Sequence, residues 1–217
     1  MNAWPIIQTR LRQSGRQLLM AAALLIVLVG GGGMNAVDAN GPQATEAMQL
    51  HVAARAEVEF DRVVMIVRDH RPGASPAWLH TLASAIVNEA RAEAIDPLLV
   101  ASIVARESSF RSRVVSSAGA VGLMQLRPWV AQAMAETSDV EWGGVETLHT
   151  PHLNVRLGVR YFKQLVERFG NERIALTAYC YGPTRVSSQV RNGTFRDSRY
   201  AQEILDLYRE FNRDMTA

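Results

Sequence analysis

The chain has 217 residues, of which 48% are hydrophobic and 20% are charged, with 15 glycines, 8 prolines and one cysteine. This composition excludes a disordered tail, a collagen-like chain and a small disulfide-linked scaffold, and Cys180 has no partner for an internal disulfide. The formal net charge of +2 arises at the front end, where Arg10, Arg12 and Arg16 are the only charged residues before residue 38. Acidic and basic residues balance from residue 40 onward, so no basic stripe predicts nucleic-acid binding.

The first 39 residues have the pattern of an export signal. After the arginines, an unbroken apolar stretch runs from Leu18 to Val29, and four glycines and further small residues lead to Ala39. A positive stretch, a short apolar stretch and a small-residue exit are typical of a secretory signal peptide. We therefore expect cleavage after Ala39 and a protein that works in the periplasm or cell envelope. The alternatives are an uncleaved membrane anchor, for which the apolar stretch is short, and an internal core helix.

The rest of the chain predicts an N-terminal helical extension over residues 40–74 and one all-α domain over residues 75–217. Ser75 before Pro76 and Asp96 before Pro97 are helix-start signals, and no segment sustains the two-residue alternation of a strand. We therefore expect an α-rich fold with little or no sheet. The expected helices cover residues 45–68, 76–94, 97 to 107 or 108, 128–136, 154–169, 172–181 and 199–211.

Three loops are expected between these helices. Residues 109–121 and 137–153 form two long loops, and a polar loop follows the helix break at Gly182-Pro183. Loops longer than about 12 residues in a compact domain are usually functional. The two long loops flank the most distinctive part of the sequence.

Glu107 is the first residue whose position suggests chemistry. It stands near the C-terminal end of an expected helix, with Ile103 and Phe110 nearby in the sequence. The negative end of the helix dipole and apolar surroundings both disfavour a carboxylate, so we expect a raised pKa. A raised pKa suits a general acid near neutral pH. From these residues alone, a solvated glutamate paired with Arg106 or Arg111 remains an alternative.

Two further segments combine small residues with side chains that bind ligands. In residues 117–126, glycine and alanine allow close approach of the backbone, Gln125 can hydrogen-bond a sugar hydroxyl or amide, and Met124 can pack under a ring. In residues 178–183, tyrosines offer hydroxyls and aromatic faces that stack on sugar rings. Each segment also fits a purely structural interpretation: a surface turn before core residues, and a helix end with buried aromatics.

Taken in order, these segments resemble the lytic transglycosylase SLT domain family, which is lysozyme-like. The resemblance covers roughly residues 78–211 and departs from the family at Cys180, where asparagine is usual. Cysteine is a weak hydrogen-bonding group, so a hydrogen bond made by that asparagine is lost or replaced here. The motifs that carry the resemblance are Glu107-Ser108-Ser109-Phe110, then Gly119 to Leu126 with Pro128, then Asn154 with Gly158 and Tyr161-Phe162, and finally Ala178-Tyr179 with Gly182-Pro183.

The resemblance implies a peptidoglycan lyase. Such an enzyme cleaves the β-1,4 bond between N-acetylmuramic acid and N-acetylglucosamine without water and leaves a 1,6-anhydro end. Glu107 would act as both acid and base, the acetamido oxygen of the substrate would stabilise the positive centre, and no metal or other cofactor is implied. Tyr179 is expected to supply the hydroxyl that contacts Glu107. The residues implied to bind or position substrate are Ser108, Ser117, Gly122, Met124, Gln125, Tyr179, Cys180 and Tyr181.

Two other functions remain open from the sequence. A glycoside hydrolase uses two carboxylates, and Asp139, Glu141 and Glu146 in the second long loop could supply the second one of a water-using muramidase. The departure at Cys180 favours a catalytically impaired protein that binds peptidoglycan or assists assembly. The expected partners are glycan strands and, as a hypothesis, a secretion or conjugation apparatus. Membrane contact is expected only through the front end.

Overall fold

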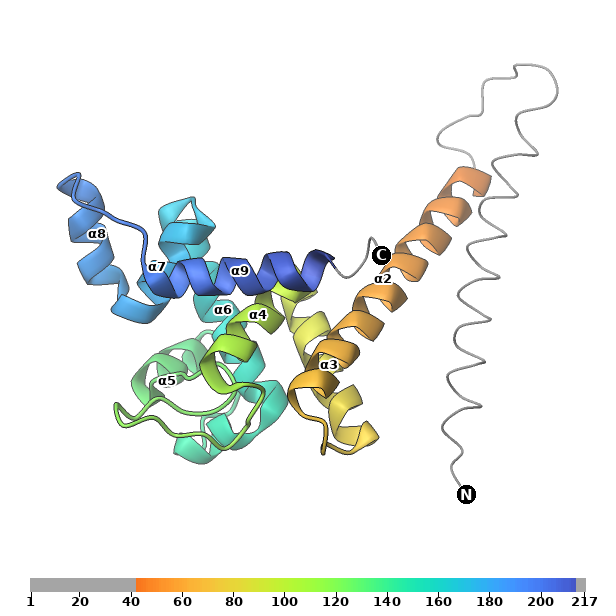
Figure 1. Ribbon diagram of the computed structural model, residues 1–217, viewed down its shortest axis with the longest axis horizontal. Helices are drawn as coiled ribbons and strands as arrows, with labels where there is room; N and C mark the ends of the chain where they lie inside the picture. Colours follow the sequence, from red (N-terminus) through yellow and green to blue (C-terminus); the bar gives the residue numbers. More distant parts are fainter. Residues whose placement is uncertain (1–41, 214–217) are drawn as a thin grey trace, which may run out of the picture. The chain divides into compact units, whose positions relative to one another are not determined.

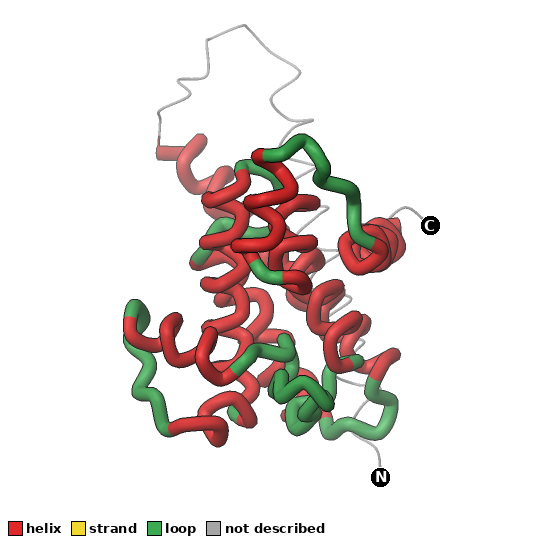
Figure 2. Tube along the Cα trace, turned by 90° about the vertical axis from the view of Figure 1, so that its left-hand side faces the viewer, coloured by secondary structure: helices red, strands yellow, loops and turns green. Residues whose placement is uncertain are grey.

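The computed structural model describes residues 42–213 (Figure 1). This part of the chain is helical, with two isolated bridges and no extended strand (Figure 2). The expected all-α fold is therefore confirmed, while the expected export signal at residues 1–39 lies outside the described residues. The helices are α2 (Pro42–His70), α3 (Pro76–Ala92), α4 (Pro97–Ser108), α5 (Pro128–Glu136), the 3₁₀ helix η1 (Gly144–His149), α6 (Pro151–Phe169), α7 (Glu172–Tyr181), α8 (Pro183–Arg191) and α9 (Arg199–Arg213).

Side-chain caps form the helix starts that the sequence predicts. Ser75 Oγ accepts a hydrogen bond from the Trp78 N–H at 3.3 Å at the start of α3, and Asp96 Oδ1 accepts one from the Leu98 N–H at 2.8 Å at the start of α4. Asn171 caps α7 in the same way. These bonds satisfy N–H groups that have no partner within the helix. Because α4 has 12 residues, the cap at Asp96 also determines where its last turn lies.

The structure differs from the expected elements after residue 137. The loop over residues 137–153 contains η1, and α6 begins at Pro151 rather than at residue 154. The expected polar loop after Gly182 was wrong in its first part, because Pro183–Arg191 forms α8. Proline is tolerated in the first turn of a helix. Val186 is the one buried residue of α8, which is too little apolar periodicity to predict a helix.

Two hydrophobic clusters form the core. The larger one joins α3, α4, α6, α7 and α9 and includes the fully buried Ile103 and Phe162. The smaller one joins α5, η1 and one face of α6 and includes Val130. Tyr161 and Tyr179 pack against both clusters. They mark the boundary between the clusters, where the cleft described below lies.

The chain separates into two units, Met1–Val58 and Glu59–Ala217. The division falls inside α2, whose residues Val63 and Val67 are fully buried within the second unit. Part of the stretch predicted as an extension over residues 40–74 therefore contributes to the helical core. Within residues 42–213, no helix has the length and apolar character needed to span a membrane.

Candidate active site

Glu107 lies in the last turn of α4, directly before a sharp turn of the chain. Ser109 and Phe110 both have left-handed backbone conformations, with φ of 49° and 58°, which residues other than glycine adopt rarely. The Phe110 side chain is fully buried. The Ser108 hydroxyl donates to the Leu123 carbonyl at 2.8 Å. These contacts hold the turn from both sides and so determine the direction in which the Glu107 side chain leaves the helix.

The Glu107 carboxyl is partly buried and contacts a tyrosine of α9. The Tyr200 hydroxyl donates to Glu107 Oε1, while Oε2 has no hydrogen-bond partner in the described part of the chain. Burial raises the pKa of Glu107, and the Tyr200 hydrogen bond and the charge of Arg106 oppose this shift. The carboxyl therefore keeps its proton to higher pH than an exposed glutamate would, as a general acid requires.

Helix α9 contacts α4 near both ends of α4 (Figure 1). Tyr208 donates to Asp96 Oδ2 at 2.6 Å at the start of α4, and Tyr200 donates to Glu107 at its end. Burial holds the pKa of Tyr200 well above its ordinary value, so its hydroxyl remains a donor. The expected contact between Tyr179 and Glu107 is therefore not made. Tyr200 is the hydrogen-bond partner of Glu107, and the Tyr179 hydroxyl donates to the Met124 carbonyl at 2.7 Å.

The arginines near Glu107 in the sequence are engaged elsewhere. Arg106 Nε donates to Glu203 Oε2 at 2.5 Å, and its guanidinium lies 5.6 Å from the ring centroid of Tyr200. Arg111 Nε donates to the carbonyl of Ser108 at 2.9 Å. Neither arginine forms an ion pair with Glu107, so the alternative of a solvated, arginine-paired helix end does not describe this site.

Asn154 of α6 holds the small-residue segment in place. Its side chain is fully buried, and its Oδ1 accepts from the Met124 N–H at 2.8 Å. Its Nδ2 donates to the carbonyls of Val121 at 3.0 Å and Leu148 at 2.9 Å. At Gly122, where φ is 82°, an added Cβ would lie 2.1 Å from Asn154 Nδ2. Only glycine therefore fits at residue 122 while this hydrogen-bond network is kept.

Gly158, one turn further along α6, makes room for Met124. A Cβ at residue 158 would lie 2.3 Å from Met124 Sδ. Met124 is fully buried, so its side chain fills the core and does not face a ligand, contrary to the expected packing under a sugar ring. Asn154 and Gly158 are one helical turn apart, so they lie on the same face of α6. Both allow this face to pack closely against residues 121–126.

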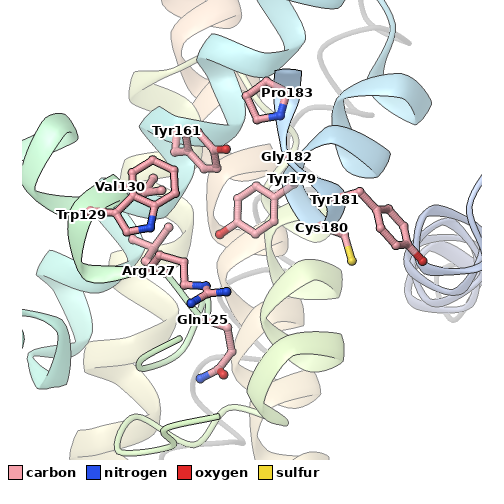
Figure 3. A pocket seen from close by; sticks show the side chains of 11 residues that line it. Gln125, Arg127, Trp129, Val130, Tyr161, Tyr179, Cys180, Tyr181, Gly182 and Pro183 are labelled. Carbon is pink, nitrogen blue, oxygen red and sulfur yellow. The ribbon is translucent and has the colours of Figure 1, made fainter. Parts of the chain in front are cut away.

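A cleft of about 250 Å³ opens between the two clusters (Figure 3). Tyr179, Cys180 and Tyr181 at the end of α7 line one side, and the start of α5 lines the other. None of the 11 lining residues is acidic. The complete lining is Gln125, Leu126, Arg127, Trp129, Val130, Tyr161, Tyr179, Cys180, Tyr181, Gly182 and Pro183.

Glu107 adjoins this cleft through its neighbours. Cys180 and Tyr181 also line a second hollow of about 330 Å³, together with Arg106, Tyr200 and the ion-paired Arg199 and Glu203. The charge of Glu107 contributes to the raised pKa of both Cys180 and Tyr179, after the larger effect of burial. The carboxyl therefore lies beside the C-terminal turn of α7, where the two hollows share their lining.

The residues predicted to bind or position substrate separate into three groups. Gln125, Tyr179, Cys180 and Tyr181 line the cleft. Ser108, Gly122 and Met124 are buried and do not line the cleft, so they contact protein rather than solvent. Ser117 is exposed in the loop between α4 and α5, outside the cleft lining.

The acidic residues left open by the sequence lie elsewhere. Asp139, Glu141 and Glu146 line a separate hollow with Thr147 and Thr150. They are absent from the cleft that adjoins Glu107. Within residues 42–213, no group of three His, Cys, Asp or Glu side chains is placed to hold a metal ion.

Sequence reasoning missed Tyr200, Arg127 and Trp129. Tyr200 is 93 residues from Glu107 along the chain, and no local pattern links the two. Arg127 and Trp129 flank Pro128, which belongs to a recognised motif, but they stand outside the motif residues themselves. Trp129 is 70% exposed, which suggests a ligand contact only because the structure places this residue at the cleft.

A comparison with known families identifies the class of protein to which this helical fold belongs. The family model of the Transglycosylase SLT domain matches residues 84–202, which is more than half of the chain. The chain therefore belongs to the Transglycosylase SLT domain family.

Several curated proteins are similar over part of this chain. The soluble lytic murein transglycosylase of Salmonella typhimurium is 34% identical over 96 residues, which cover 43% of this chain and 15% of that protein. The transglycosylase of Enterobacteria phage PRD1 is 34% identical over 93 residues, covering 43% of this chain and 32% of that protein. The chain thus matches less than a third of the length of either relative.

Solved structures show the same fold. The lytic transglycosylase Slt of Pseudomonas aeruginosa, solved as an inactive glutamate-to-glutamine mutant, is 26% identical with a TM-score of 0.55, covering 62% of this chain and 24% of that chain. The 70 kDa soluble lytic transglycosylase of Escherichia coli is 22% identical with a TM-score of 0.58, covering 76% of this chain and 30% of that chain. The latter likeness concerns the fold alone.

Proposed function

We propose that this protein is a peptidoglycan lytic transglycosylase. It cleaves the β-1,4 bond between N-acetylmuramic acid and N-acetylglucosamine and leaves a 1,6-anhydro end on the muramic acid. The observation that carries the proposal is the Glu107 carboxyl, which burial keeps protonated to higher pH beside a cleft whose described lining contains no acidic residue. Membership of the SLT family supports the same reaction.

A single carboxyl group can perform each proton transfer of this reaction. Glu107 gives its proton to the glycosidic oxygen as the bond from that oxygen to muramic C1 breaks. The acetamido oxygen of the muramic acid bonds to C1 and takes up the positive charge. The Glu107 carboxylate then removes the proton of the C6 hydroxyl, whose oxygen bonds to C1 and displaces the acetamido oxygen. Glu107 ends protonated, so it is ready for another cycle.

Tyr200 supports both states of Glu107 in this sequence. Its hydroxyl donates to Oε1, and this bond is stronger when the carboxyl is ionised. Oε2 is left for the proton that is exchanged with the substrate. Burial favours the acid form before cleavage, and the Tyr200 hydrogen bond limits the cost of the carboxylate after it.

We place this activity in the cell envelope, where its substrate lies. The positively charged, apolar front end of the sequence supports export. A role in opening the wall locally for an envelope-spanning secretion or conjugation machine is a further part of the proposal. Cell fractionation tests the location, and a gene remote from any transport operon would argue against the machine.

Product analysis tests the reaction. The purified chain is incubated with isolated cell wall, and the soluble products are identified by mass spectrometry. We expect anhydro-muropeptides from the wild type and a loss of at least about 100-fold in the Glu107→Gln variant, because a positioned acid-base group contributes about 10²–10⁴-fold. Products with reducing ends would instead identify a muramidase. Wall binding without release of fragments would identify the binding-protein alternative.

A further inference from the structure

Among the described residues that line the cleft, Arg127 is the only charged one. Its guanidinium carries a positive charge, and no ion pair involves Arg127 in the described part of the chain. Its Nη1 donates to the carbonyl of Ala118. That neutral partner holds the guanidinium in place without neutralising its charge. The cleft therefore presents a fixed cation whose other N–H groups are available to a ligand.

The surroundings of Arg127 favour an anionic group on the ligand. Figure 3 shows its guanidinium between Trp129 on one side of the cleft and Cys180 on the other. The residue precedes the first turn of α5, so the positive end of that helix dipole adds to its charge. Carboxylates match the planar fork of guanidinium donors and can bind it with two parallel hydrogen bonds.

Trp129 adds an apolar surface next to this charge. Its side chain is 70% exposed although it belongs to a cleft with Tyr161 and Tyr181. An exposed tryptophan beside aromatic neighbours is suited to contact with sugar rings or peptide side chains. A ligand that combines rings with a nearby carboxylate would therefore use both features at once.

We propose that Arg127 and Trp129 form a subsite for a carboxylate on the C3 substituent of N-acetylmuramic acid. This inference rests on the proposed function. The sugar rings of a glycan strand are uncharged, so the anion must come from this substituent. Two sources share the chemistry: the carboxylates of the stem peptide, and the lactyl carboxylate that is free when the stem has been removed. The subsite makes the chain select muramic acid strands over a neutral glycan.

The test measures binding separately from cleavage. Glu107→Gln protein serves as the background, so that ligands stay intact, and Arg127→Met and Trp129→Ala are added to it singly. Three ligands are compared by calorimetry: soluble strands with stems, strands stripped of stems by an amidase, and a neutral chito-oligosaccharide. Arg191→Met, an exposed arginine at the end of α8 and outside the cleft, is the matched control.

We expect Arg127→Met to weaken binding of a carboxylate-bearing strand about 10- to 100-fold, as loss of a charged hydrogen bond does, and to leave the chito-oligosaccharide unaffected. A loss confined to strands with stems assigns the stem peptide, and a loss that includes the stripped strands assigns the lactyl carboxylate. Trp129→Ala should weaken all three ligands. An equal effect of Arg127→Met on all three ligands, or no effect on any, would overturn the subsite.

Cleavage assays then separate this inference from the proposed function. If the wild type cleaves wall to anhydro products but Arg127→Met keeps the wild-type KM on every strand, the lyase stands and the subsite fails. If no protein cleaves wall but the selectivity in binding is seen, the subsite stands and the lyase fails. Circular dichroism of each variant shows whether the fold is kept.

Discussion

The buried frame of the site and its exposed rim differ in almost every physical respect. The frame consists of Ser108, Gly122, Met124 and Asn154, whose side chains or Cα atoms are buried and interlocked. The rim consists of Arg127, Trp129, Cys180 and Tyr181, which are exposed around the cleft. The frame holds the backbone next to Glu107 through the Ser108 hydrogen bond, whereas the rim is open to solvent and can contact a ligand.

This difference explains why a recognisable motif need not touch the ligand. In the frame, each residue meets a steric or hydrogen-bonding requirement that few side chains satisfy, as Gly122 and Asn154 do for each other. On the rim, the protein places no such constraint on a side chain such as Trp129. The choice of residue there depends instead on contacts with a ligand. We therefore expect substitutions in the frame to act on stability and substitutions on the rim to act on substrate choice.

The largest effect should follow from Asn154→Ala in the frame. This change leaves the buried Met124 N–H and the Leu148 carbonyl without the partner that Asn154 supplies. The Val121 carbonyl also loses the Asn154 bond but keeps the one from the Leu126 N–H. We expect the free energy of unfolding to fall by about 3 kcal/mol, measured by urea denaturation. Asn88→Ala, at an exposed position of α3, should change it by less than about 0.5 kcal/mol. Similar losses of stability in both variants would contradict the special role of the frame.

Tyr200→Phe should lower wall cleavage about tenfold without unfolding the chain, because it removes one hydrogen bond to a charged group. That bond lowers the pKa of Glu107, so its loss raises this pKa further. The decline of activity with rising pH, as the acid form is lost, should move to higher pH. Tyr208→Phe on the same helix, which loses the bond to Asp96 instead, is the control and should leave the pH profile unmoved.

Glu107→Gln should have a smaller and pH-dependent effect on stability. The pKa of Glu107 in the folded protein is raised above its ordinary 4.5, so the folded state binds the proton more tightly than the unfolded state. The stability that this proton contributes is present at low pH and is lost as pH rises through the folded pKa. Thermal unfolding should therefore find the glutamine variant more stable than wild type at neutral pH, with no such gain below pH 4.5. A gain that is independent of pH would contradict the ionisation of a buried carboxyl.

The smallest effect should come from Cys180→Ser on the rim. Cys180 is an exposed residue, and no hydrogen bond to its sulfur is found within residues 42–213. Thermal unfolding should show a change in stability of less than about 0.5 kcal/mol. Although the residue is exposed, partial burial of its sulfur and the nearby Glu107 raise the pKa of the thiol, so its alkylation should also be slow at neutral pH. A large loss of stability would place Cys180 in the frame instead.

Local signals predicted most of the helical fold and failed where a helix lacked them. The caps at Ser75, Asp96 and Asn171 are hydrogen bonds within one helical turn, so neighbouring residues in the sequence predict them. Helix α8 has one buried residue, Val186, and its stability depends on contact with α7. The same reasoning singled out Glu107 and predicted Tyr179, which does line the cleft, but it assigned to Tyr179 a contact that Tyr200 makes.

The sequence by itself determined the helical class, the start of α4 and the place of an acidic residue at its end, because caps and apolar periodicity depend on neighbouring residues. Only the tertiary structure decided the burial of Glu107, its hydrogen bond to Tyr200 and the grouping of Arg127 with Trp129 in one cleft. Burial and hydrogen bonding between distant segments arise from how helices pack. Two residues that lie 93 positions apart in the chain carry no shared local signal of that contact.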